Sequence, residues 1–296
     1  MIKERLNPLN DFAFQKAMGE KGDEAQLTAF LNVVLTRTGK NHIESVEVLE
    51  DKDLPAPVIG GKAGKLDVLV RLADGTKVNI EVQLANQYNM ERRSLDYWAW
   101  HYAKGIGSGQ NYSLLPAVIG INILDFGYIP VEEYHTSFHI YEDRHKDYML
   151  TDALELHFLD MVKFRKWPEK DIANDRLQRW LVYFDKNSPV KLIEEVLGMD
   201  MAIQEMQKKI DWIQGDPALL RSYLKYEKAA SDEITRIYGA KKEGREEGVR
   251  EGREEGKKEG RREEKLAIAQ KMKNRGLPAA QIAEDTGRSI DDIKSL

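Results

Sequence analysis

Two short runs in the first third of the chain alternate apolar and polar side chains with a period of two. They cover residues 65–72 and 78–84, and each presents one entirely apolar face. Such alternation is typical of half-buried β-strands, so both runs are predicted to be strands. The dipeptide Asp74-Gly75 lies between them and favours a tight turn, which makes the pair a predicted hairpin.

The length of the turn decides which side chains of this hairpin face one another. A two-residue turn would set apolar positions against polar ones, whereas a three-residue turn over 73–75 keeps the apolar faces matched. The longer turn needs Gly75 in the left-handed conformation of a bulge. It also sets Asp67 directly opposite Glu81, with Cβ atoms roughly 5 Å apart. Because two carboxylates at that distance repel each other, we interpret the pair as a candidate site for a divalent cation.

Helices and further strands are predicted on both sides of the hairpin. Residues 8–38 read as helical with a break at Gly19–Gly22, and Gly39 stands where a helix C-cap is expected. Residues 88–106 form a second predicted helix, and its core-facing stripe is Leu95, Trp98, Tyr102 and Ile106. Strands are predicted over residues 43–50, 117–124, 137–142 and 153–159. The order helix, three strands, helix, strand predicts an α/β fold with a mixed sheet flanked by helices.

The second half of the chain changes in composition and suggests four parts in all. An α/β core is expected over 1–165, a helical extension over 166–239, a charged linker over 240–265 and a small helical tail over 266–296. In the linker glycine recurs every four residues among Glu, Lys and Arg, which predicts a marginal helix or a flexible spacer. A close-packing face for a partner helix is the alternative.

The tail resembles a miniature helix-turn-helix, but its last helix carries Asp291 and Asp292. DNA groove binding requires neutralisation of phosphates, so a module for homo-oligomerisation is an equal alternative to DNA readout. The whole chain of 296 residues has a formal net charge of −5 and no cysteine. With no apolar run long enough to span a membrane and no signal peptide, we expect a soluble, cytoplasmic protein without a membrane partner.

The chemistry of the candidate site follows from its oxygen atoms. The carboxylates of Asp67 and Glu81 and the backbone carbonyl of Val82 suit a hard cation, with Mg²⁺ preferred and Mn²⁺ or Ca²⁺ as alternatives. Gln83 lies two residues after Glu81 and would orient a water beside the carboxylates. This set is suited to metal-assisted phosphodiester hydrolysis. The plain alternative is an exposed sheet face with scattered polar residues, because the pattern is weak by spacing alone.

Several short stretches together resemble a known family. They are Asn10–Lys16, Phe30–Asn32, Lys65–Val68, Ile80–Gln83 and Arg93–Trp98. Their order resembles that of the PD-(D/E)XK nuclease superfamily, and in particular the bacterial recombination-promoting nuclease and transposase family. The resemblance covers roughly residues 5–160, and it implies a restriction-endonuclease-like α-β-β-β-α-β core.

The resemblance also implies roles for individual residues. Asp67 and Glu81 would bind the metal, and Gln83 would occupy the position where the superfamily usually has Lys. Gln lacks the positive charge of Lys but can still hydrogen-bond the attacking water. An additional acid often completes such sites, and Asp11 and Glu24 are the candidates. Asn10 or Asp11 is expected to cap the first helix, and for Asp11 the capping role is favoured over a place in the site.

A basic and aromatic helix face is the candidate DNA contact. Arg93, Tyr97, Trp100 and Lys104 recur at helical spacing and suit phosphate contact and base stacking. A solvated helix face is the alternative interpretation. The favoured function is a metal-dependent DNA endonuclease linked to recombination or mobile elements. A catalytically weak or inactive DNA-binding or assembly protein with the nuclease fold, and more remotely a transposase proper, are the other hypotheses.

Overall fold

The computed structural model describes residues 5–37, 39–49, 68–107 and 109–296. The first part of the chain holds α1 (Asp11–Met18), α2 (Ala25–Val34), β1 (Val46–Val48), β2 (Val68–Leu72), β3 (Lys77–Gln83) and α3 (Met90–Ala103). The middle part holds β4 (Val118–Leu124), β5 (His135–Tyr141), β6 (Met149–Asp160), α4 (Met161–Lys166) and α5 (Arg176–Phe184). The last part holds α6 (Val190–Met199), α7 (Met201–Gly215), α8 (Pro217–Asn274), α9 (Ala279–Thr286) and α10 (Ile290–Lys294).

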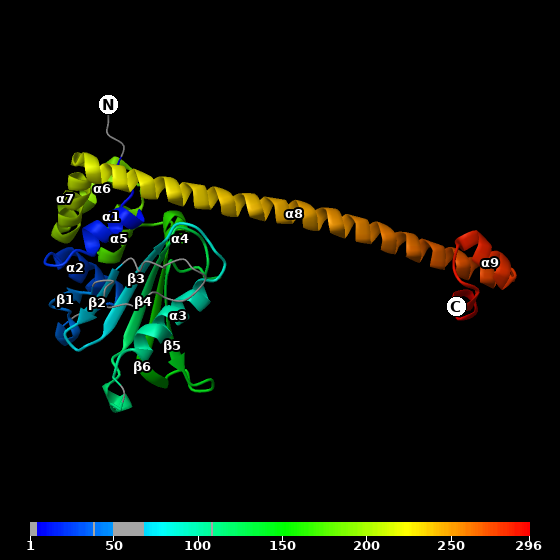
Figure 1. Ribbon diagram of the computed structural model, residues 1–296, viewed down its shortest axis with the longest axis horizontal. Coiled ribbons are helices and arrows are strands. Elements are labelled where there is room, and N and C mark those ends of the chain that lie inside the picture. The colour runs from blue at the N-terminus through cyan, green and yellow to red at the C-terminus, as the bar shows by residue number, and fades with distance from the viewer. Residues whose placement is uncertain (1–4, 38, 50–67, 108) are drawn as a thin grey trace. The chain divides into compact units, whose positions relative to one another are not determined.

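The described strands form one six-stranded mixed sheet in the order β1-β2-β3-β4-β6-β5 (Figure 1). β3 pairs with β4 in parallel, and β4 with β6 in parallel, while the outer pairs are antiparallel. β3 and β4 therefore lie at the centre of the sheet. The predicted α/β fold with a mixed sheet flanked by helices is confirmed.

The hairpin of β2 and β3 has the predicted three-residue turn. Val68 pairs with Ile80, and Arg71 with Lys77. Leu72 N donates to Thr76 O at 2.8 Å, and Gly75 has a φ of +90°. Only glycine adopts that conformation without strain, so this position fixes the turn and with it the register of the two strands. Asp67, the residue before β2, lies outside the described residues.

The two faces of the sheet are covered by different helices (Figure 1). The apolar side chains of β3, Val78, Ile80 and Val82, pack into one large core with α1, α2, α5, α6 and α7. The residues Trp180, Leu181, Tyr183 and Phe184 of α5 are fully buried in it. α3 covers the other face, where Met90 packs against Leu124, Leu156 and Phe158 in a smaller cluster. The side chains of β3 that face α3 are polar.

Two local expectations are wrong. α2 ends at Val34, with Leu35 as its C-cap, rather than at Gly39, which lies in a separate 3₁₀ turn at Gly39–Asn41. On α3 the buried residues are Met90, Ser94 and His101, while Leu95 of the predicted stripe is 44% exposed. The apolar and aromatic residues of α3 are compatible with more than one buried helix face. The face that packs on the sheet is the one with Ser94, because the side chains of β3 beneath the helix are polar.

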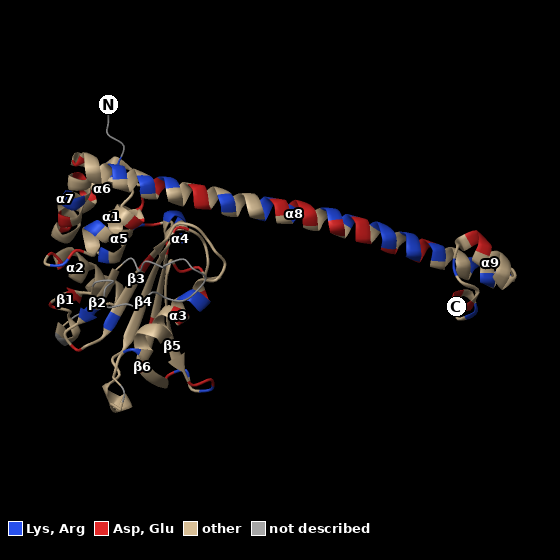
Figure 2. Cartoon of the chain, in the orientation of Figure 1, with Lys and Arg blue, Asp and Glu red and all other residues tan. Residues whose placement is uncertain are grey.

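The chain divides into two compact units, Met1–Ile234 and Thr235–Leu296. Residues 240–265 are helical within α8, where basic and acidic side chains alternate (Figure 2). Pairs such as Arg250 and Glu247, 3.4 Å apart, support this helix against its glycines. In the tail, Ala269, Ile282 and Ile293 form a small core, and Ser289 caps α10. The four-part domain division and the oligomerisation role of the tail stay predictions. Among the described residues, no helix has the length and apolar character needed to cross a membrane.

Candidate active site

Glu81 is the central residue of the candidate site. It lies in the middle of β3, on the face toward α3, with Asn79 and Gln83 on the same side of the strand. The period-two pattern of residues 78–84 predicted a half-buried strand, yet Glu81 is only 2% exposed and Asn79 only 5%. The reason is that α3 covers this face, so a charged position that read as solvent-facing is interior.

The carboxylate of Glu81 is buried without adequate partners. Neither of its oxygens accepts a well-aligned hydrogen bond from a described residue. Arg93 Nε lies 3.3 Å from Glu81 Oε2 and forms an ion pair with it. Burial raises the pKa of Glu81 to about 7, although the charge of Arg93 and the neighbouring Asn79 and Gln83 side chains oppose the rise. A carboxylate in this state favours any further positive charge that reaches it.

Polar side chains beside Glu81 extend the site across β4 to α3. Asn122 of β4 is the lateral neighbour of Glu81 in the parallel ladder. It accepts a hydrogen bond of 2.9 Å from Ser94 Oγ and donates one of 3.1 Å to the backbone oxygen of His157. Sequence reasoning missed Ser94 and Asn122. The signal for Asn122 was present, because it interrupts the otherwise apolar run over 117–124.

Arg93 links Glu81 electrostatically to α1. Burial raises the pKa of Asp11, and the charge of Arg93 partly opposes this, so the two groups sense each other. Asp11 is not the helix cap that the sequence favoured. Asn10 is the cap, and its side chain accepts hydrogen bonds from the backbone of Phe12 and Ala13. Asp11 is the first residue of α1, and its carboxylate is not used for capping.

Glu24 makes a local contact instead. It precedes α2 without capping it, and its carboxylate accepts a hydrogen bond of 2.7 Å from the backbone of Gly22. Within the described part of the chain, which excludes Asp67, no group of three or more His, Asp or Glu side chains is arranged to hold a metal ion. Val82 lies in the ladder between β3 and β4, opposite Ile123.

A family model matches residues 8–240 of this chain, and its description is PD-(D/E)XK nuclease family transposase. The chain belongs to this family. The matched range contains every strand of the sheet as well as the helices that cover both of its faces. No curated protein and no solved structure matches the chain.

Nucleases of the PD-(D/E)XK type generally use divalent metal ions. Both Glu81 oxygens and the Asn79 Oδ1 atom are buried and accept no well-aligned hydrogen bond from a described residue, although Arg93 forms an ion pair with Glu81 Oε2. Hard divalent cations take carboxylate and amide oxygens of this kind. Gln83 lies two residues after Glu81 at the end of β3, and its assignment to the position where the superfamily usually has Lys stays a prediction.

The candidate DNA-contacting side chains of this family member form two pairs along α3. The guanidinium carbon of Arg93 lies 5.4 Å from the ring centroid of Tyr97, and Lys104 Nζ lies 4.6 Å from that of Trp100. Cation–aromatic stacking holds the long basic side chains in fixed positions. The neighbouring Trp98 has a structural role. Its indole donates a hydrogen bond of 3.0 Å to the backbone oxygen of Ala153 and stacks on Tyr102.

Proposed function

We propose that this protein is a metal-dependent DNA endonuclease that hydrolyses phosphodiester bonds and acts in recombination or in mobile elements. The observation that carries the proposal is Glu81, a carboxylate buried at the centre of the sheet that has an ion pair with Arg93 but accepts no well-aligned hydrogen bond from a described residue. Burying such a group is costly unless a ligand compensates it, and a divalent cation is the ligand that the donor set fits. Mg²⁺ is the preferred ion, with Mn²⁺ or Ca²⁺ as alternatives.

Asp67 is the proposed second ligand, although it lies outside the described residues. Support comes from the register of the hairpin, in which Val68 pairs with Ile80. The proposal continues this register by one residue, to Asp67 and Glu81. The backbone carbonyl of Val82 is the third proposed ligand, and Asp11, released from capping, is favoured over Glu24 as an additional acid.

The other side chains would bind and orient the reacting groups. A cation held by Asp67 and Glu81 would lower the pKa of a water and stabilise the charged phosphoryl oxygens. Gln83 would hold that water through its amide oxygen, which accepts a hydrogen bond from the water and adds no charge. Arg93 would exchange its ion pair with Glu81 for a phosphate, and Tyr97, Trp100 and Lys104 would contact the DNA farther along α3.

Cleavage of plasmid DNA tests this proposal. Purified protein is expected to nick or cut DNA with Mg²⁺ or Mn²⁺ and not with EDTA. Asp67→Ala and Glu81→Gln are each expected to reduce the rate by at least roughly a hundredfold, the scale of losing one electrostatic stabiliser. Glu91→Gln, an exposed acid of α3, is the matched control and should cleave normally. Full activity in Glu81→Gln would overturn the assignment.

A second candidate function is a DNA-binding or assembly protein that has the nuclease fold but does not cleave. The observations favouring it are Gln83 in place of a charged residue and Arg93, which already pairs with Glu81. It predicts DNA binding that needs no metal and no cleavage under any metal. Under that function Asp67→Ala would leave DNA binding unchanged.

A further inference from the structure

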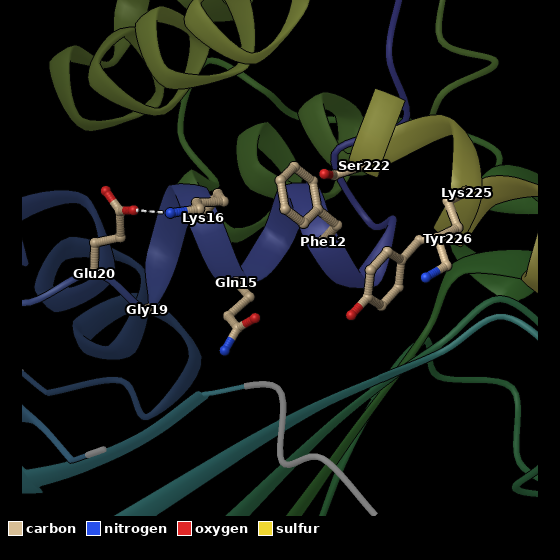
Figure 3. Close-up of a pocket in the computed structure, with 8 residues that line it drawn as sticks. All are labelled: Phe12, Gln15, Lys16, Gly19, Glu20, Ser222, Lys225 and Tyr226. Carbon is tan, nitrogen blue, oxygen red and sulfur yellow. Dashed lines mark hydrogen bonds and ion pairs between the residues drawn. The ribbon is translucent and has the colours of Figure 1, made fainter. Parts of the chain in front are cut away.

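A groove lies between α1 and the first turns of α8, within the first compact unit (Figure 3). Its volume is about 450 Å³, within the range of pockets that hold small organic molecules. The residues lining it are Phe12, Gln15, Lys16, Gly19, Glu20, Ser222, Lys225 and Tyr226. None of these residues was singled out as a binding residue from the sequence, because the two helices are about two hundred residues apart in the chain.

The aromatic side of the groove is already in place. Phe12 of α1 and Tyr226 of α8 stack with ring centroids 5.8 Å apart and an interplanar angle of 30°. The start of α8 is held against the N-terminal segment by Tyr223, which is 1% exposed and whose hydroxyl accepts a hydrogen bond of 2.9 Å from Asn7 N. Tyr226 itself stays 37% exposed, so one aromatic surface remains open to a planar ligand.

The polar side of the groove carries net positive charge. Lys16 is neutralised by Glu20, with Lys16 Nζ and Glu20 Oε1 2.6 Å apart. Lys225 is exposed and forms no ion pair with any described residue. Figure 3 shows the amide of Gln15 and the ring of Tyr226 extending to the same side of α1. One unpaired ammonium, one amide and one aromatic ring suit a phosphate joined to a planar, hydrogen-bonding base.

α1 connects this groove to the candidate active site. Asp11, which senses the charge of Arg93, directly precedes Phe12 on the helix. At the other end of α1, a Cβ at Gly19 would lie only 3.2 Å from Val68 Cγ2, so the helix rests on the start of β2. A ligand in the groove is therefore close to the strands of the hairpin.

We infer that this groove binds one nucleotide of a DNA strand, with the base against Tyr226 and a phosphate on Lys225. The inference rests on the proposed DNA substrate, but it does not need cleavage. A nucleotide within a strand is favoured over a free nucleotide because the proposed substrate is a DNA strand.

Binding of a labelled oligo(dT) of about ten nucleotides to the full chain, measured by fluorescence anisotropy, tests the inference. The Glu81→Gln background and EDTA prevent cleavage and remove the repulsion of the buried carboxylate. Lys225→Ala and Tyr226→Ala are each expected to weaken binding by roughly tenfold. Lys225→Ala should also reduce the magnitude of the salt slope by about 0.7, the share of one phosphate on a single strand. Lys228→Ala, an exposed lysine of α8 that does not line the groove, is the matched control.

The outcomes separate the groove from the proposed catalysis. Weaker binding in Lys225→Ala and Tyr226→Ala but not in Lys228→Ala supports the groove, whether or not the wild-type chain cleaves DNA. Unchanged binding and salt slope in both groove variants overturns it, even if metal-dependent cleavage is intact. Thymidine monophosphate forms the second arm. If it competes as strongly as the oligonucleotide on a molar basis, the inference that the groove takes a strand is overturned.

Discussion

Two glutamates on central strands of the same sheet differ in what surrounds them. Glu81 of β3 and Glu155 of β6 lie on opposite faces, as the shared register through β4 requires. Their side chains are 3% and 16% exposed, respectively. Both were carboxylates in an alternating strand, yet only Glu155 has a close, well-aligned hydrogen-bond partner, whereas Glu81 has the ion pair with Arg93 at 3.3 Å.

Glu155 has a full set of partners. His157 Nε2 lies 2.8 Å from Glu155 Oε1, Arg37 approaches Oε2 at 3.5 Å, and His139 lies 3.9 Å away. Burial pushes the pKa of Glu155 up, but the hydrogen bond and the charges of these neighbours outweigh it, so the pKa is lowered overall. For Glu81 the balance is reversed, and burial raises the pKa to about 7.

The comparison separates a structural carboxylate from one that is suited to a ligand. A buried carboxylate with its full set of partners has no need of a further cation, and removing it leaves those partners unpaired, which is destabilising. An unsatisfied one lowers the stability of the ligand-free protein and becomes favourable when a cation arrives. The predictions below test that contrast by making the same change at both positions.

The largest expected effect is an opposite change in stability from Glu→Gln at the two sites. The folded-state pKa of Glu81 is about 7, against an ordinary value of 4.5 for glutamate, so its stability contribution is complete below pH 4.5 and is lost as pH rises through 7. At pH 8 in EDTA, Glu81→Gln should therefore be more stable than the wild type by about 3 kcal/mol. Glu155→Gln should be less stable by about 2 kcal/mol, because it weakens hydrogen bonds to charged groups.

Urea unfolding at pH 8 and pH 4.5 measures both changes. The gain from Glu81→Gln should nearly vanish at pH 4.5, where the wild-type carboxyl is protonated. Glu91→Gln on the exposed side of α3 controls for a general effect of removing one negative charge. A Glu81→Gln variant that is less stable than the wild type at pH 8 would show that Glu81 is adequately paired within the protein.

Metal binding should also distinguish the two positions, with an effect on the free energy of unfolding slightly smaller than that of Glu81→Gln. A ligand at a hundred times its dissociation constant stabilises the folded state by about 2.7 kcal/mol. Mn²⁺ or Mg²⁺ is thus expected to raise the melting temperature of the wild type and of Glu155→Gln by several degrees. Glu81→Gln should show no such shift. Equal shifts in all three proteins would place the bound ion elsewhere.

Local patterns predicted most of the sheet. The alternation of the hairpin and the need for matched faces fixed the turn at Gly75, and four residues of β2 pair as that turn requires. The run over 117–124 is β4 in the structure, and it was predictable for a different reason, because a strand covered on both faces is apolar on both. The register of the hairpin is predictable because a shift of one residue would expose every apolar side chain of a half-buried strand.

The candidate site was harder to predict from the sequence, because it depends on which helix face covers the polar side of the sheet. The stripe through Leu95 was as regular as the one through Ser94, and sequence alone could not choose between them. The hydrogen bond of 2.9 Å between His135 and His157 was equally hidden, since the β5–β6 register joins residues far apart in the chain. Asn10 and Asp11 are both good caps, and only the helix start selected Asn10.

The smallest expected effect concerns acid stability on the Glu155 side of the sheet. Burial and the neighbouring His157 lower the pKa of His135 to about 4 from the ordinary histidine value of 6.5, although the charge of Asp175 opposes the shift. The unfolded chain then binds a proton that the folded chain refuses, so this stability is present above pH 6.5 and is lost as pH falls toward 4. His135 alone should therefore cost about 1 kcal/mol between pH 6.5 and 5.5.

His135→Gln removes that titration while it keeps a hydrogen-bonding group beside His157. Its unfolding free energy should fall less steeply than that of the wild type over the same pH interval. His42→Gln, a change at an exposed histidine, should leave the wild-type slope unaltered. If His135→Gln loses stability as steeply as the wild type, the histidine is not held neutral. The contrast between a satisfied and an unsatisfied face of the sheet would then rest on Glu81 alone, since the network around Glu155 would accept charge as readily as solvent does.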